Sequence, residues 1–132
     1  MQIDHIGIAV KSLTDAVRVY EDVLGLKVSG YDQVDDQGVR VAMVPAGDSR
    51  IELLEPITAN SPIEKFMSKR GEGIHHIALR VDNIEEALDR FKAAGARLID
   101  STPRAGAHNT RIAFVHPAST HGVLLELVEH VK

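Results

Sequence analysis

The chain of 132 residues has no cysteine, no apolar run long enough to span a membrane and no cluster of basic residues. Without cysteine there are no disulfides or thiolate-bound metals, and a membrane helix needs about 18 consecutive apolar residues. The 15 basic and 19 acidic residues give a formal net charge of −4, which argues against a nucleic-acid partner. The amino-terminal residues also lack the apolar segment of a signal peptide. We therefore expect a cytoplasmic protein that binds neither nucleic acid nor membrane.

What the sequence does contain is an internal repeat. "DHIGIAV" begins at Asp4 and "HHIALRV" at His75, and each is followed by a helix-capping residue, Ser12 or Asn83, ahead of apolar residues at helical spacing. The first of these apolar stripes consists of Leu13, Ala16, Val17, Tyr20 and Leu24. Short β-like runs then follow at residues 27–34, 38–45, 50–56, 97–102, 110–116 and 122–129. Each half is therefore predicted to have the element order β-α-β-β-β.

Length and composition favour a single folding unit, because 132 residues at 44% hydrophobic content suffice for one shared core. We expect one domain over residues 1–132, with a first module at 1–58 and a second at 74–132. Ser61 and Pro62 are typical of a helix start, so residues 59–73 are predicted to form a connecting helix and linker.

Two histidines occupy equivalent positions in the repeat. Because side chains alternate along a strand, His5 shares one face with Gly7, and His76 shares one face with Ala78, while aliphatic residues occupy the other face. The small neighbours leave space for a ligand above each histidine. His75 has the opposite orientation and is expected to pack. A lone histidine on a strand is commonly an ordinary hydrogen-bonding residue, but the repeated pair favours metal binding.

Two glutamates repeat in the same way. Glu52 in "RIELLEP" and Glu126 in "VLLELVE" each lie between aliphatic residues, where a carboxylate is costly unless a cation or a donor compensates it. The alternative is a strand turned so that the glutamate faces solvent, as we expect for Glu55 and Glu129. Two imidazoles and two carboxylates suit a borderline divalent ion with open positions for a chelating substrate.

Longer strings carry a family resemblance: "GVRVAMVPAGDSRIELLEP", "SPIEKFMSKRGEGIHHIALRVDNIEEAL", "GAHNTRIAFVHP" and "GVLLELVE". Over residues 3–129 the chain resembles the vicinal-oxygen-chelate superfamily (glyoxalase, bleomycin resistance protein and dioxygenase), and within it the methylmalonyl-CoA epimerase family. The resemblance implies an α+β fold in which two tandem βαβββ modules form a cupped mixed sheet around a metal site. It also implies a homodimer.

The resemblance assigns the metal ligands to His5, Glu52, His76 and Glu126. The implied cofactor is one divalent metal ion, with Co2+ favoured and Ni2+, Mn2+, Zn2+ or Fe2+ as alternatives. Some epimerases carry a glutamate, proposed as one of two bases, where this chain has Val41. Glyoxalases have glutamates at both end-strand positions, so Glu126 and Glu52 are the predicted catalytic residues here.

The implied reaction is the interconversion of (R)- and (S)-methylmalonyl-CoA, a small-molecule acyl-CoA substrate, by removal and return of the Cα proton. A metal would stabilise the developing enolate, and two carboxylates would act as base and conjugate acid. Three alternatives use the same fold: a glyoxalase-like lactoylglutathione lyase, an Fe(II) extradiol dioxygenase, and a non-enzymatic ligand-binding module. The complete set of metal ligands argues against the last of these.

Overall fold

A computed structural model describes residues 1–131. The chain divides into two compact units: His5–His75 forms one, and residues 1–4 together with the chain from His76 onward form the other. The single-domain organisation over residues 1–132 stays a prediction.

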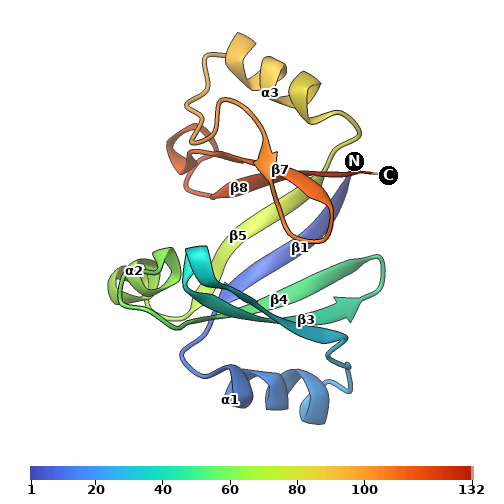
Figure 1. Ribbon diagram of the computed structural model, residues 1–132, viewed down its shortest axis with the longest axis vertical. Helices are drawn as coiled ribbons and strands as arrows, with labels where there is room; N and C mark the ends of the chain where they lie inside the picture. The colour runs from blue at the N-terminus through green and yellow to red at the C-terminus, as the bar shows by residue number, and fades with distance from the viewer. Residues whose placement is uncertain (132) are drawn as a thin grey trace. The chain divides into compact units, whose positions relative to one another are not determined.

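The first βαβββ module is confirmed, and it lies almost entirely in the unit His5–His75. Its elements are β1 (Gln2–Ala9), α1 (Leu13–Arg18), β2 (Gly30–Val34), β3 (Val39–Ala46) and β4 (Ser49–Pro56). The strand order is β2-β3-β4-β1, with β1 parallel to β4 and the other two pairs antiparallel. Figure 1 shows α1 on one face of β3 and β4.

The helix-facing side of this sheet forms an apolar core. Leu53 and Val44 are fully buried there, against Leu13 and Val17 of α1. Burial of each large aliphatic side chain contributes roughly 1.5–3 kcal/mol. The strand face that carries Ile8 and Val10 therefore turns toward α1, and the alternate residues of β1 turn the other way.

The first helix differs from the predicted regular stripe. Ser12 caps α1 by accepting a hydrogen bond from the N–H of Asp15, but α1 gives way to a π-helical turn at Val19–Val23. The wider turn changes the residue spacing around the helix. Tyr20 still packs on the core, whereas Leu24 is 61% exposed, so its predicted place in the apolar stripe is wrong.

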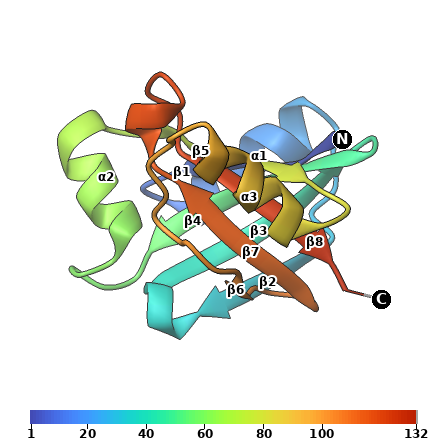
Figure 2. The same cartoon turned by 90° about the horizontal axis from the view of Figure 1, so that it is seen from above.

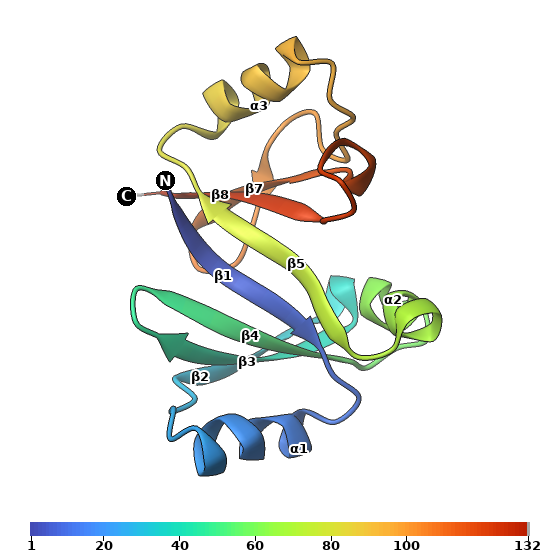
Figure 3. The same cartoon turned by 180° about the vertical axis from the view of Figure 1, so that it is seen from behind.

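The second βαβββ module repeats the first. It consists of β5 (Gly73–Arg80), α3 (Ile84–Ala93), β6 (Arg104–Ala105), β7 (Thr110–Val115) and β8 (Leu125–His130). The strand order is β5-β8-β7-β6, with β5 parallel to β8. In Figures 2 and 3, α3 lies over β7 and β8, as α1 lies over its own strands in the first module. The predicted α+β class and its repeated element order are confirmed.

One predicted strand of the second module is wrong. Residues 97–102 form only an isolated bridge, between Leu98 and Val115, and the strand next to β7 is instead the two-residue β6. The segment remains close to β7, because the carboxylate of Asp100 accepts a hydrogen bond from the N–H of Phe114 at 2.9 Å. Side-chain bonding of this kind replaces part of a regular ladder.

The connecting helix α2 (Pro62–Arg70) is confirmed. The Ser61 side chain accepts a hydrogen bond from the N–H of Ile63, Pro62 occupies the first turn, and Gly71 ends the helix with a φ of 73°. Ile63 anchors α2 in a second apolar cluster of the first module, beside Leu54. None of the helices within residues 1–131 is both long enough and apolar enough to cross a membrane.

Candidate metal centre

His76 and Glu126 form a buried pair in the second module. In the parallel pairing of β5 with β8, Ala78 lies opposite Glu126, so His76 and Glu126 project from the same face of the sheet. His76 Nε2 lies 3.4 Å from Glu126 Oε1, and both residues are only 7% exposed. The ring of Phe114, opposite Glu126 on β7, meets the His76 ring edge to face at 5.9 Å.

The other face of the same strands explains this orientation. Leu127 of β8 and Ala113 of β7 belong to the apolar cluster against Leu88 of α3. Because side chains alternate along β8, placing Leu127 under the helix turns Glu126 to the opposite face. The buried carboxylate is therefore fixed by the hydrophobic pattern around it.

His5 and Glu52 form the equivalent pair in the first module. Gly7 of β1 lies opposite Glu52 of β4, the counterpart of Ala78 opposite Glu126. His5 Nε2 lies 3.6 Å from Glu52 Oε1, and the two side chains are 6% and 15% exposed. The predicted equivalence of the two histidine–glutamate pairs thus holds within each module, at the level of register and of distance.

Arg50 is a part of this site that sequence reasoning missed. It lies opposite His5 on β4, and its guanidinium donates to Glu52 Oε2 from Nη2 at 2.7 Å and from Nε at 2.9 Å. Nη2 also lies 3.4 Å from His5 Nδ1. The available signal was the spacing in "RIE", since residues two apart on a strand share a face.

The donor chemistry of these residues fits a divalent ion. His5, His76 and Glu126 are buried, and each offers one ligand atom of the kind that borderline metals prefer. Buried acids and imidazoles without a cation carry a desolvation cost that a metal offsets. Glu52 differs from Glu126, because Arg50 already compensates part of its charge.

Val41, which stands where some epimerases have a glutamate, lies in an apolar part of the structure. Val41 is 8% exposed and belongs to the cluster with Ala9, Leu54 and Ile63. Val41 of β3 lies opposite Leu54 of β4, which is two residues after Glu52. Val41 and Glu52 therefore project from the same face of the sheet. This face of the first module is therefore polar around His5 and apolar around Val41.

His75 packs as expected rather than joining the paired residues. Its ring meets Phe66 of α2 edge to face at 5.0 Å. Partial burial lowers the pKa of His75 below the ordinary value of 6.5, because desolvation disfavours the imidazolium form.

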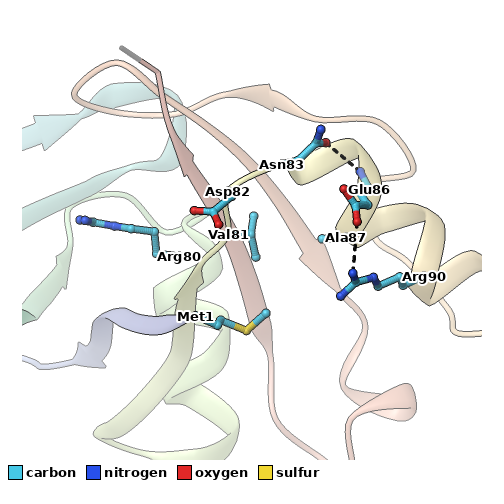
Figure 4. A pocket seen from close by; sticks show the side chains of 8 residues that line it. All are labelled: Met1, Arg80, Val81, Asp82, Asn83, Glu86, Ala87 and Arg90. Carbon is cyan, nitrogen blue, oxygen red and sulfur yellow. Dashed lines mark hydrogen bonds and ion pairs between the residues drawn. The ribbon is translucent and has the colours of Figure 1, made fainter.

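A pocket of about 210 Å³ opens beside the start of α3, and none of the predicted site residues lines it (Figure 4). Two of its lining residues pair with each other, Arg90 with Glu86 at 3.1 Å, and the Asn83 side chain accepts from the N–H of Glu86. Figure 4 shows the guanidinium of Arg80 turned away from the Glu86–Arg90 pair. The pocket gives no sign of a second site.

Comparison with known proteins finds a matching family model, similar sequences and similar structures. A sequence model of the Glyoxalase/Bleomycin resistance protein/Dioxygenase superfamily matches residues 4–114. The uncharacterized protein YqjC of Bacillus subtilis is 46% identical, covering 97% of this chain and 91% of that protein. An ethylmalonyl-CoA/methylmalonyl-CoA epimerase of Cereibacter sphaeroides is 40% identical, covering 96% of each. The crystal structure of methylmalonyl-CoA epimerase from Mycobacterium tuberculosis has a TM-score of 0.91 at 41% identity, covering 98% of this chain and 88% of that one.

Proposed function

Because the chain belongs to the glyoxalase/bleomycin resistance protein/dioxygenase superfamily, we propose that it is a metal-dependent epimerase that interconverts (R)- and (S)-methylmalonyl-CoA. The observation that carries the proposal is the histidine–glutamate pair that recurs at equivalent register in the two modules, fully buried in the second and largely buried in the first. Similarity over nearly the whole length to epimerases of alkylmalonyl thioesters supports the substrate class.

The proposed ligands of the metal are His5, Glu52, His76 and Glu126. When bound, a divalent ion would supply a Lewis acid for the negative charge that develops on the thioester oxygen. The contribution of the protein is to hold the donors in place, as the Phe114 ring does by packing against His76. Co2+ is our first choice of ion, with Ni2+, Mn2+, Zn2+ and Fe2+ as alternatives.

Glu126 and Glu52 are the proposed proton-transfer groups. Epimerisation removes the Cα proton on one face and returns a proton on the other, so it needs two groups that can serve as base and as conjugate acid. Val41 offers no titratable group, and the resemblance to glyoxalases, which have glutamates at both end-strand positions, makes these two glutamates our candidates. A carboxylate that binds a metal through one oxygen keeps its other oxygen for proton transfer, so each of these glutamates can also be a metal ligand.

Deuterium exchange tests this proposal. The metal-loaded protein and a chelated control would be incubated with methylmalonyl-CoA in deuterium oxide, while Cα deuterium uptake and stereochemistry are followed. We expect metal-dependent exchange with inversion, abolished by Glu126→Gln. The matched control is Glu129→Gln, which changes a carboxylate of the same strand that faces α3 and should leave exchange intact.

Failure of this experiment would be informative. Absence of exchange with every divalent metal would overturn the epimerase proposal. Turnover of a glutathione hemithioacetal would then favour the glyoxalase-like lyase, whereas metal-dependent oxygen consumption would favour an extradiol dioxygenase. A protein that binds acyl-CoA without any turnover would favour the non-enzymatic binding module. A homodimer in the cytoplasm remains our expectation for the state of the protein in the cell.

A further inference from the structure

We propose that Arg50 competes with the divalent ion for the His5–Glu52 pair, and that it lowers the affinity of the protein for metal. This inference rests on the proposed function, because it concerns an ion at the same residues. Arg50 supplies a positive charge within hydrogen-bonding distance of both side chains.

The contacts of Glu52 support competition. Both short contacts from Arg50 end on one oxygen, Oε2, at 2.7 and 2.9 Å. These are charge-assisted hydrogen bonds, which are about twice as strong as neutral ones. The Glu52 side chain is 15% exposed and that of Arg50 is 26% exposed, so solvent screens the pair only in part. The guanidinium therefore already supplies a counter-charge to this partly buried carboxylate.

The contact of Arg50 with His5 is a second reason to expect competition with the metal. A guanidinium has N–H donors and no acceptor, so the 3.4 Å contact of Arg50 Nη2 with His5 Nδ1 is favourable only if Nδ1 accepts. A histidine that binds metal through Nε2 carries its proton on Nδ1 and donates it to a neighbour. Two donors would then face each other. Metal coordination by His5 Nε2 and the present Arg50 contact thus exclude one another.

Charge acts in the same direction. A cation beside two ligands raises the free energy of a divalent ion at those ligands, because like charges repel most strongly where water is scarce. Removing the cation while keeping its apolar stem should therefore favour the ion. The same change should destabilise the metal-free protein, since Glu52 would lose its charge-assisted partner. A residue with a purely structural role would lower stability and metal affinity together.

The test measures Co2+ and Zn2+ affinity by calorimetry, and metal-free stability by urea unfolding, for the full chain. We expect Arg50→Met to bind either ion at least about tenfold more tightly than the wild type, although its metal-free form unfolds at lower urea. Arg50→Lys keeps the charge and should bind metal within about threefold of the wild type. The control Arg18→Met removes an exposed arginine of the same module, which pairs only loosely with Asp15 at 3.9 Å, and should change neither quantity.

Each result bears on the proposal. If the wild type binds metal and Arg50→Met binds it equally or more weakly, while Arg50→Lys is folded and binds normally, the competition is refuted and the proposed function stands. If Arg50→Met does not fold, an Arg50→Gln variant provides the same comparison with a polar side chain. If no form of the protein binds either ion, this inference and the metal part of the proposed function both fail.

Discussion

Glu129 accepts a hydrogen bond through Oε2 from the backbone N–H of Ile84 at 3.0 Å, across 45 positions of sequence. Glu55 makes the same bond to the N–H of Leu13, also at 3.0 Å. In each module, then, a carboxylate three residues after the paired glutamate satisfies the first amide of the covering helix, where negative charge also complements the helix dipole. The expectation that these two glutamates simply face solvent is wrong, because both are partly buried by this role.

We predict that Glu129→Ala and Glu55→Ala each lower the free energy of unfolding by about 1 kcal/mol, the usual cost of losing a helix cap. Glu129 also binds Arg111 at 3.1 Å, so its loss should be the larger of the two. Urea unfolding monitored by circular dichroism measures both changes. Asp89→Ala, at an exposed position beyond the first turn of α3, is the control. Equal stability of all three variants would show that the bonds contribute nothing.

Gly38→Ala should destabilise the protein more than Gly47→Ala. Both glycines have positive φ, 59° and 65°, which costs an alanine about 1 kcal/mol in each case. A methyl group at Gly38 would also collide with the Thr58 side chain, whereas one at Gly47 would meet no atom within 4 Å. We expect a further loss of about 1–2 kcal/mol at Gly38 from this overpacking. Thermal and urea unfolding of the two variants provide the comparison, and equal losses would contradict the steric argument.

Asp4→Ala should lower the free energy of unfolding by about 1–3 kcal/mol. The Asp4 side chain is fully buried, and its Oδ1 lies 2.7 Å from His130 Nε2 and 3.1 Å from Arg80 Nη2. A deeply buried pair would cost more to break, but Arg80 and His130 are about 40% exposed and can be rehydrated. A double-mutant cycle with Arg80→Ala measures the coupling free energy between Asp4 and Arg80. If the two single-variant losses simply add in the double variant, the ion pair does not contribute to stability.

The stability of the metal-free protein should fall as the pH is lowered through about 6.5, in part because of His75. Burial lowers the pKa of His75 in the folded protein, so the unfolded state binds the proton more readily. Below the pKa of the unfolded state this proton binding favours unfolding, and the folded protein loses stability. His75→Phe keeps a ring against Phe66 and removes this titration. The free-energy difference between about pH 7.5 and about pH 5 should therefore be smaller in the variant than in the wild type. An unchanged difference would show that His75 does not contribute.

Addition of Co2+ should raise the stability of the wild type, because an ion that binds only the folded protein stabilises it by mass action. At a free ion concentration one hundred times the Kd, the gain is about 2.7 kcal/mol. His76→Gln removes one buried donor and should abolish most of this gain. Differential scanning calorimetry at several ion concentrations measures the shift, and a chelator should reverse it. A shift of the same size in His76→Gln would place the ion elsewhere.

Local signals were sufficient for much of this protein. Helix caps at Ser12, Ser61 and Asn83 act within a few residues, so the helix starts could be located from the sequence. Strand alternation likewise placed His5 and His76 on the faces opposite the apolar residues, because a period of two is a property of the backbone itself. The repeat then predicted that each histidine has a glutamate partner in the last strand of its module.

Contacts between elements far apart in the sequence could not be predicted from such local patterns. The π-helical turn next to Leu24 depends on how neighbouring segments fit together. So does the loss of the strand at 97–102, where the Asp100 carboxylate accepts a hydrogen bond from the N–H of Phe114. The same holds for Glu55, whose bond to a helix start requires β4 and α1 to be adjacent.

The sequence by itself determined the two modules, the faces of their strands and the four candidate ligands, because alternation and capping are encoded over a few residues. Tertiary structure decided which groups surround those ligands: the Phe114 ring against His76, and the Arg50 guanidinium on Glu52 and His5. A strand pattern specifies the side to which a residue points. The partner that it meets there is specified by register and packing between strands, which only the folded chain provides.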